Sequence, residues 1–257
     1  MAARPPQGML RTGALPGSCF VSGLGAADDE RVAAAALVHG LKALGLLVAA
    51  MTPMALDGVF RAGRWTSAHL EHLGREGSFG LPGPALSPYV LPPAATPALA
   101  AQQAGLHIKG QAVVETYQVL ATWADVIVVE GVGGLEVPLG PSLAVHDLVR
   151  HLALPLVLAI RPDENALQRV AGAMQRAQVA GVRVAGWIAT GVTDEAAQVL
   201  PPLTAALGQP AMAALPLHAA SGQAAARHLD LATLRASLAL GPGGSFQESA
   251  RTAAPRT

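Results

Sequence analysis

Apolar residues recur along the chain with two alternating periods. Short and nearly continuous apolar runs, typical of strands that are covered on both faces of a sheet, occupy residues 19–22, 46–51, 126–129, 156–160 and 182–189. Between these runs, apolar residues at helical spacing predict helices over residues 28–44, 66–73, 96–105, 111–124, 145–152, 164–180 and 193–207. Strands that alternate with helices predict a three-layer α/β/α sandwich around a doubly wound, mostly parallel sheet.

The remaining segments divide the chain into one domain and two tails. Residues 1–17 are rich in Pro, Gly and Arg and are expected to form a flexible leader, and residues 241–257 are expected to form a disordered tail. One α/β domain over residues 18–240 accounts for the rest, because such domains commonly reach this length. Within it, residues 52–97 are punctuated by Gly, Pro and Ser, and a connection of that length usually carries function.

Charge and cysteine content exclude several classes of protein. Only 13% of the residues are charged and the net charge is zero, so we expect neither nucleic acid nor a membrane as a partner. No apolar run approaches the roughly 18 to 20 residues that span a bilayer, and the first residues lack the apolar core of a signal peptide. Cys19 is the single cysteine, which excludes an internal disulfide and favours a cytoplasmic location.

A carboxylate followed by glycines marks the end of the apolar run at residues 126–129. Glu130 comes directly after this predicted strand, and Gly131, Val132, Gly133 and Gly134 follow it. Ligands of open α/β sheets bind at the carboxyl ends of the strands, where glycines let the backbone approach a ligand closely. We therefore favour Glu130 as a ligand of Mg²⁺ or as a group that orients a substrate amine, over the alternative that it caps the following turn.

The loop after the first predicted strand lacks a phosphate-binding sequence. From Gly23 to Arg31 it reads GLGAADDER, where a P-loop would read GxxxxGK[ST]. Asp28, Asp29 and Glu30 lie at the start of the next helix, so we expect them to cap that helix and to compete with an anion for its N-terminus. Arg31 is the one cation of the segment that could reach a phosphate.

Three other patterns are weaker. Gly23 and Gly25 begin a dinucleotide-binding pattern that is one glycine short, and no acid ends the second predicted strand to hold a ribose. His69 and His72 share a helical face and could bind a metal, but a solvated helix surface is favoured because no third ligand is near in sequence. No motif indicates a hydrolase. The tryptophans, Trp65, Trp123 and Trp187, are expected to be packing residues.

Several short motifs, taken together, give the chain a family resemblance over about residues 18–218. They are Phe20-Val21-Ser22-Gly23, Thr52-Pro53, Thr96-Pro97, Glu130-Gly131-Val132-Gly133-Gly134 with Pro138-Leu139, and Gly186-Trp187-Ile188-Ala189. In order and spacing the chain resembles the dethiobiotin synthetases. That resemblance implies a P-loop-type α/β fold and a homodimer. It also implies the use of ATP and Mg²⁺ to convert a diamino acid, 7,8-diaminononanoate, and CO₂ into dethiobiotin.

The resemblance also assigns positions to the site. Asp29, Glu30 and Arg31 stand where the family has Gly-Lys-Thr, and Thr52 stands where it has a second lysine. Ser67 stands near the family's metal-binding aspartate, Leu56 at a substrate-contacting serine and Thr190 at an adenine-binding asparagine. The candidate cofactor-binding residues are Gly23, Asp28, Asp29, Glu30, Arg31, Glu130, Gly131, Val132, Gly133 and Thr190, the candidate catalytic residues are Thr52 and Arg31, and the candidate metal ligand is Glu130.

Two functions remain open from the sequence. Phosphoryl transfer depends almost entirely on positioning and on the stabilisation of charge, so the loss of two lysines and two metal ligands weighs against it. The chain is then either an ATP- and Mg²⁺-dependent enzyme of biotin synthesis that uses rearranged groups such as Arg31, Arg61, Arg64 and Asp57, or a non-catalytic homologue that binds a ligand or a partner.

Overall fold

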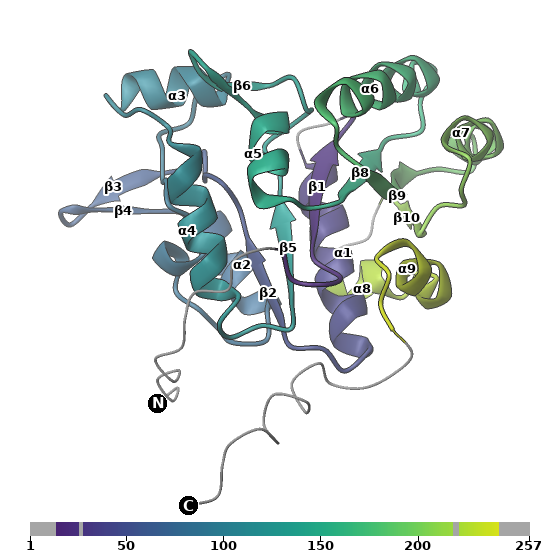
Figure 1. Ribbon diagram of the computed structural model, residues 1–257, viewed down its shortest axis with the longest axis horizontal. Coiled ribbons are helices and arrows are strands. Elements are labelled where there is room, and N and C mark those ends of the chain that lie inside the picture. Colours follow the sequence, from purple (N-terminus) through teal and green to yellow (C-terminus); the bar gives the residue numbers. More distant parts are fainter. Residues whose placement is uncertain (1–13, 26–27, 218–220, 242–257) are drawn as a thin grey trace, which may run out of the picture.

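A six-stranded parallel sheet forms the centre of the protein in the computed structural model, which describes residues 14–25, 28–217 and 221–241 (Figure 1). The strands lie in the order β10-β9-β8-β1-β5-β2, and every pair of neighbours is parallel. The α/β sandwich predicted from the sequence is confirmed. The strands are β1 (Cys19–Gly23), β2 (Val48–Met51), β5 (Val126–Glu130), β8 (Leu156–Ile160), β9 (Val184–Val192) and β10 (Ala213–Pro216).

Helices cover both faces of this sheet (Figure 1). On one face α4, α5 and α6 contact one another in succession, and on the other α1 contacts α2 and α8. The apolar strands 126–130 and 156–160 are fully buried between these layers, as expected for a parallel sheet. The helices are α1 (Asp29–Ala43), α2 (Ala68–Glu76), α3 (Pro97–Gln103), α4 (Gly110–Leu120), α5 (Val145–Leu152), α6 (Ala166–Ala180), α7 (Leu200–Leu207), α8 (Gly222–Ala226) and α9 (Leu231–Ser237).

The strand register brings the ends of three central strands to one edge of the sheet. In β1, Val21 lies opposite Glu130 of β5, and Gly23 lies opposite Ala159 of β8. The loop that leads into α1, the acidic glycine turn after β5 and Arg161 after β8 therefore meet at the carboxyl edge, where parallel sheets bind ligands.

The structure corrects four local predictions. The expected helix over residues 193–207 is a 3₁₀ turn, η2 (Ala196–Val199), followed by α7, because Pro201 and Pro202 lack the N–H groups that a continuous helix needs. Segment 52–97 contains an antiparallel hairpin and a second 3₁₀ turn, and a smaller hairpin follows β5. Strand β10 and helices α8 and α9 were not predicted. The additional elements are β3 (Val59–Arg61), β4 (Arg64–Thr66), η1 (Gly83–Ala85), β6 (Pro138–Gly140) and β7 (Leu143–Ala144).

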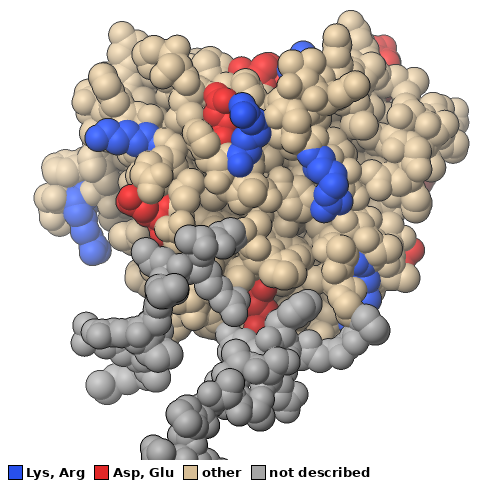
Figure 2. Space-filling view, in the orientation of Figure 1, with Lys and Arg blue, Asp and Glu red and all other residues tan. Residues whose placement is uncertain are grey.

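Charged side chains are scattered over the surface. On the face seen in Figure 2, basic and acidic residues lie among large areas of uncharged residues, and one acidic and one basic side chain touch in the upper centre of the view. Along the described ranges, no helix is long and apolar enough to cross a membrane. The predicted leader and tail lie mostly outside the described residues. Leu15, within the expected leader, is buried and donates its backbone N–H to the hydroxyl of Tyr117.

Candidate functional site

The side chain of Glu30 fills the space beside Gly23 at the end of β1. An ideal Cβ on Gly23 would collide with Glu30 Oε2, so a larger residue at this position would displace the carboxylate. Glu30 lies in the first turn of α1 and is buried. In a phosphate-binding loop this position beside the helix N-terminus receives an anion from a ligand. Here the protein places its own carboxylate there.

A second carboxylate fills the next part of the loop. The Asp29 side chain is almost completely buried, and its Oδ1 accepts a hydrogen bond of 2.7 Å from Arg161 Nη2. A Cβ on Gly25 would meet Asp29 Oδ2 and the Arg161 side chain. The guanidinium of Arg161 also lies against Gly191 of β9. Asp29 and Arg161 thus form a partly buried ion pair that connects the start of α1 to the end of β8 and to β9.

The environment of Glu30 favours its neutral form. Burial, more than any other influence, raises the pKa of Glu30 to about 7. The nearby carboxylates of Glu130 and Asp29 act in the same direction, whereas hydrogen bonds from the backbone at Glu30 and Gly133 act in the opposite direction. Near neutral pH, a larger fraction of Glu30 is therefore protonated than of an ordinary glutamate.

Glu130 ends β5 and faces two basic side chains. His69 Nε2 lies 2.8 Å from Glu130 Oε1, and Arg31 Nε lies 3.9 Å from the same oxygen. His69 and Glu130 are both buried, with side chains 9% and 6% exposed. Neither His69 Nε2 nor Glu130 Oε2 has a hydrogen-bond partner among the described residues. Arg31 also pairs with Asp28 at 3.1 Å.

The glycines after Glu130 hold the turn against β1. The backbone N–H of Gly131 donates to Val21 O, and a Cβ on Gly131 would collide with that oxygen and with the Phe20 ring. Ser22 Oγ donates to Gly133 O at 2.8 Å, and Gly133 adopts a positive φ of 106°, which favours glycine. Gly131 and Gly133 are therefore required by the packing and the backbone conformation of this turn, whatever ligand it contacts.

Asp57 precedes β3 in the chain and contacts the N-terminus of α2, the helix that carries His69. Ser67 Oγ donates to Asp57 Oδ1 at 2.5 Å, and the His69 backbone N–H donates to Asp57 Oδ2 at 2.9 Å. Burial is the largest single influence and raises the pKa of Asp57, but these hydrogen bonds together lower it below its ordinary value. Asp57 thus anchors the helix that supplies His69 to Glu130.

Two candidate site residues, Thr52 and Thr190, are buried next to strand ends. Thr52 follows β2, and its hydroxyl donates to Met54 O at 3.2 Å. Thr190 belongs to β9, and its Oγ1 has no hydrogen-bond partner within the described part of the chain. Thr52 therefore lacks the positive charge that the family resemblance gives to its position.

The structure corrects three predictions about side chains. Asp28 is the N-cap residue of α1 but makes no side-chain cap hydrogen bond, because it pairs with Arg31 instead. The expectation that His69 lies on a solvated surface is wrong, since the ring is buried against Glu130. Trp65 is 42% exposed, so it is not a core residue, whereas Trp187 is fully buried as expected. Arg161 was not predicted as a site residue, although its position after an apolar strand is the same signal that identified Glu130.

The residues present do not fit a magnesium–triphosphate group. The side chains of Glu30 and Asp29 occupy the loop beside Gly23 and Gly25, where they fill space and offer no positive charge to a phosphate. Lys42, one of only two lysines in the chain, lies in the last turn of α1 and donates to Glu76 O. No group of three metal-ligating side chains comes together among residues 14–25, 28–217 and 221–241.

The strand order of the parallel sheet, with helices on both faces, defines a P-loop-type α/β protein, although the loop between β1 and α1 has an altered sequence. In agreement with this class, the family model described as "AAA domain" matches residues 32–225, and the match begins just after the altered loop. The chain belongs to the dethiobiotin synthetase family. It is 33% identical over 223 residues to the ATP-dependent dethiobiotin synthetase BioD of Ralstonia nicotianae, which covers 85% of this chain and 97% of that protein.

Solved structures of more distant proteins share the fold. The MinD cell division protein of Aquifex aeolicus matches with a TM-score of 0.53 and 12% identity, covering 88% of this chain and 98% of that one. Cobyrinic acid a,c-diamide synthase of Mycobacterium smegmatis, with bound ADP and magnesium, matches with a TM-score of 0.51 and 17% identity, covering 89% and 99%. At these identities the likeness shows the α/β architecture alone.

Proposed function

We propose that this protein is a non-catalytic member of the dethiobiotin synthetase family, which binds a small ligand or a partner without transferring phosphate from ATP. The observation that carries the proposal is the Glu30 carboxylate beside Gly23. The resemblance assigns the phosphate-binding lysine to this position, so a positive charge is replaced by a carboxyl group, anionic or protonated, at the point where phosphate would bind.

The energetic argument concerns the charges that phosphoryl transfer requires. Catalysis of this reaction depends on cations that stabilise the transferring group, and removal of one preorganised donor costs roughly 10²- to 10³-fold in rate. In this chain Glu30 and Thr52 stand at the two lysine positions that the resemblance assigns. Together these replacements predict a loss of many orders of magnitude in rate.

Glu130, the one retained acid of the implied metal site, already contacts two basic side chains of the protein. His69 and Arg31 lie 2.8 Å and 3.9 Å from its Oε1. Basic side chains at these distances occupy the space beside Oε1 that a divalent cation would need, and the Arg31 guanidinium would repel such a cation. In this proposal Glu130 therefore serves as a buried acid that contacts His69 and Arg31, and its Oε2, which lacks an internal partner within the described ranges, is the atom that a ligand amine would pair with.

A second candidate function is dethiobiotin synthesis itself, with 7,8-diaminononanoate, CO₂, ATP and Mg²⁺ as the reactants. The observation that favours it is the 33% identity to a dethiobiotin synthetase over nearly all of that protein. Arg31 and Arg161 are then the cations available at the altered loop, although both already pair with carboxylates. A homodimer and a cytoplasmic location, which the family resemblance implies, are proposed for either function.

Turnover by the purified full chain separates the two functions. We expect no dethiobiotin, measured by mass spectrometry, above the protein-free background when 7,8-diaminononanoate, bicarbonate and magnesium–ATP are supplied. A Glu130→Gln variant is the matched control, because it keeps the shape of the side chain and removes its charge. If the parent protein forms dethiobiotin and the Glu130→Gln variant does not, the proposal is overturned and the protein is an enzyme.

A further inference from the structure

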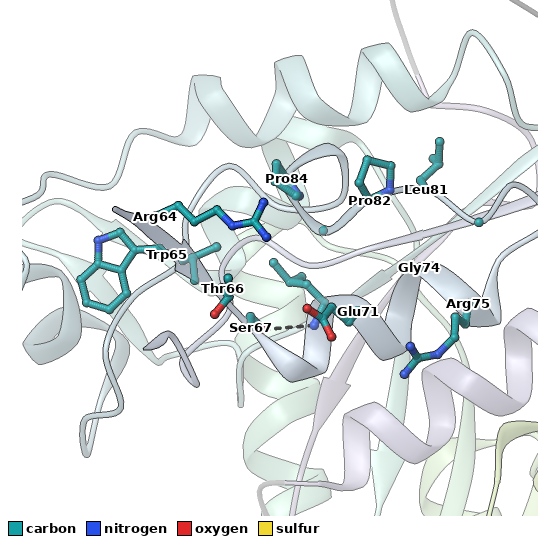
Figure 3. Close-up of a pocket in the computed structure, with 14 residues that line it drawn as sticks. Arg64, Trp65, Thr66, Ser67, Glu71, Gly74, Arg75, Leu81, Pro82 and Pro84 are labelled. Atoms are coloured by element: carbon teal, nitrogen blue, oxygen red, sulfur yellow. Dashed lines mark hydrogen bonds between the residues drawn. The ribbon is translucent and has the colours of Figure 1, made fainter. Parts of the chain in front are cut away.

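A cavity of about 400 Å³ lies between α2, the end of β4 and the segment that contains η1 (Figure 3). Small-molecule sites commonly have volumes of about 300 to 1,000 Å³. The floor of the cavity includes the buried side chain of Leu70 and the closely packed backbone of Gly74, where a Cβ would meet Leu81 O. Pro82 and Pro84 line the opposite wall and give it a rigid backbone.

This cavity is separate from the site at the carboxyl edge of the sheet. The α2 residues that line it recur at helical spacing and so share one face of the helix: Ser67, Leu70, Glu71, Gly74 and Arg75. His69 and His72 belong to the opposite face of α2, where His69 meets Glu130 and His72 meets Glu76. A ligand in the cavity therefore has no access to Glu130 through the helix.

Two side chains of opposite charge, Arg64 and Glu71, line the cavity without pairing. Arg64 extends from β4 towards the Pro82–Pro84 segment, and the carboxylate of Glu71 points from α2 into the same space (Figure 3). Neither side chain forms an ion pair or a side-chain hydrogen bond with any residue that the structure describes. A ligand that carries both an anionic and a cationic group can therefore pair with both.

We propose that this cavity binds a free α-amino acid with an aliphatic side chain. Arg64 is suited to the carboxylate, because a guanidinium presents two parallel N–H donors to it. Glu71 is suited to the ammonium group. Leu70, Leu81 and Val90 supply the apolar surface that an aliphatic side chain needs. The proposal is independent of the proposed function, because it uses the opposite face of α2.

The test uses the full chain and three probes of nearly the same size. L-Leucine carries both charges, 4-methylpentanoate lacks the ammonium group and 3-methylbutylamine lacks the carboxylate. Titration followed by protein NMR is expected to give millimolar binding of L-leucine, with each analogue at least about tenfold weaker. Absence of leucine binding, or equal binding of either analogue, would overturn the proposal.

Variants locate the binding site. Arg64→Gln and Glu71→Gln are each expected to weaken leucine binding at least about tenfold, since each removes one charged partner. Arg61→Gln is the matched control, because Arg61 lies opposite Arg64 in the same hairpin but does not line the cavity. Leucine affinity in this control should stay within about twofold of the parent value. Unchanged leucine affinity in both cavity variants would also overturn the proposal. Both cavity side chains are exposed, so their replacement is not expected to disturb folding.

Discussion

His69 Nε2 lies 2.8 Å from Glu130 Oε1, and both side chains are buried at the carboxyl edge of the sheet. The two residues come from α2 and from the end of β5, which are distant in sequence. Asp57 holds the start of α2 in place through Ser67 and the His69 backbone. The acid that the family resemblance assigns to a metal ion is thus paired with a basic side chain of the protein.

The coupling of His69 to Glu130 can be measured by a double-mutant cycle. We expect His69→Ala and Glu130→Gln to be non-additive in the free energy of unfolding by about 1 to 2 kcal/mol, because a buried partner is lost in each. Arg31→Gln with Glu130→Gln is the comparison, and its coupling should be below about 0.5 kcal/mol, since Arg31 is partly exposed and 3.9 Å away. Urea unfolding of each variant supplies the energies, and additivity of the first pair would contradict the account.

Glu30 is predicted to make the stability of the protein depend on pH. Its pKa is raised from 4.5 to about 7 in the folded protein, so between these values the folded state holds a proton that the unfolded state has lost. The free energy of unfolding is therefore expected to fall as the pH rises through this window, by about 3 kcal/mol in total. The favourable contribution is complete below pH 4.5 and lost above about pH 7.

The Glu30→Gln variant isolates this effect, because glutamine has the same shape and does not titrate. Urea unfolding of both proteins at acid and mildly alkaline pH should show the variant gaining about 2 to 3 kcal/mol relative to the parent as the pH rises. Parallel pH profiles for the two proteins would show that burial beside Gly23 does not raise the pKa of Glu30.

Cys19 is predicted to be unreactive in the folded protein. It is fully buried in β1, and burial raises the pKa of its thiol to about 12. The thiolate is the reactive species, so a thiol reagent should label native protein only as fast as the chain unfolds. Absorbance with a disulfide reagent should show immediate labelling in denaturant and slow labelling without it. Rapid stoichiometric labelling of the native protein would mean that β1 is not in the core.

The fold could be predicted from the sequence because its strongest signals are local. The apolar runs 126–129 and 156–160 are long enough and bounded clearly enough to identify central strands. β10 was not predicted because its four residues include a proline and alternate in exposure, which is a weak pattern. The exposed hairpin of β3 and β4 was not predicted for a similar reason, since its apolar residues Phe60 and Trp65 pack on each other rather than on the core.

The site was only partly accessible to sequence reasoning. Glu130 was identified because a carboxylate after a buried strand is a local signal. The pairing of His69 with Glu130 and of Asp29 with Arg161 depends on which helix and loop meet at the sheet edge, and spacing along the chain does not contain that information. The sequence showed that Glu30 replaces a lysine, but only the packing against Gly23 shows where its carboxylate goes.

Binding of magnesium–ATP to the full chain tests the central claim most directly, because that claim places the Glu30 carboxylate where a phosphate would bind. We predict no heat of binding by calorimetry and an unchanged melting temperature at millimolar magnesium–ATP. A ligand at a hundredfold excess over its Kd would stabilise the fold by about 2.7 kcal/mol, or roughly 5 to 10 °C for a domain of this size. A rise of that order, accompanied by saturable heat, would contradict the account.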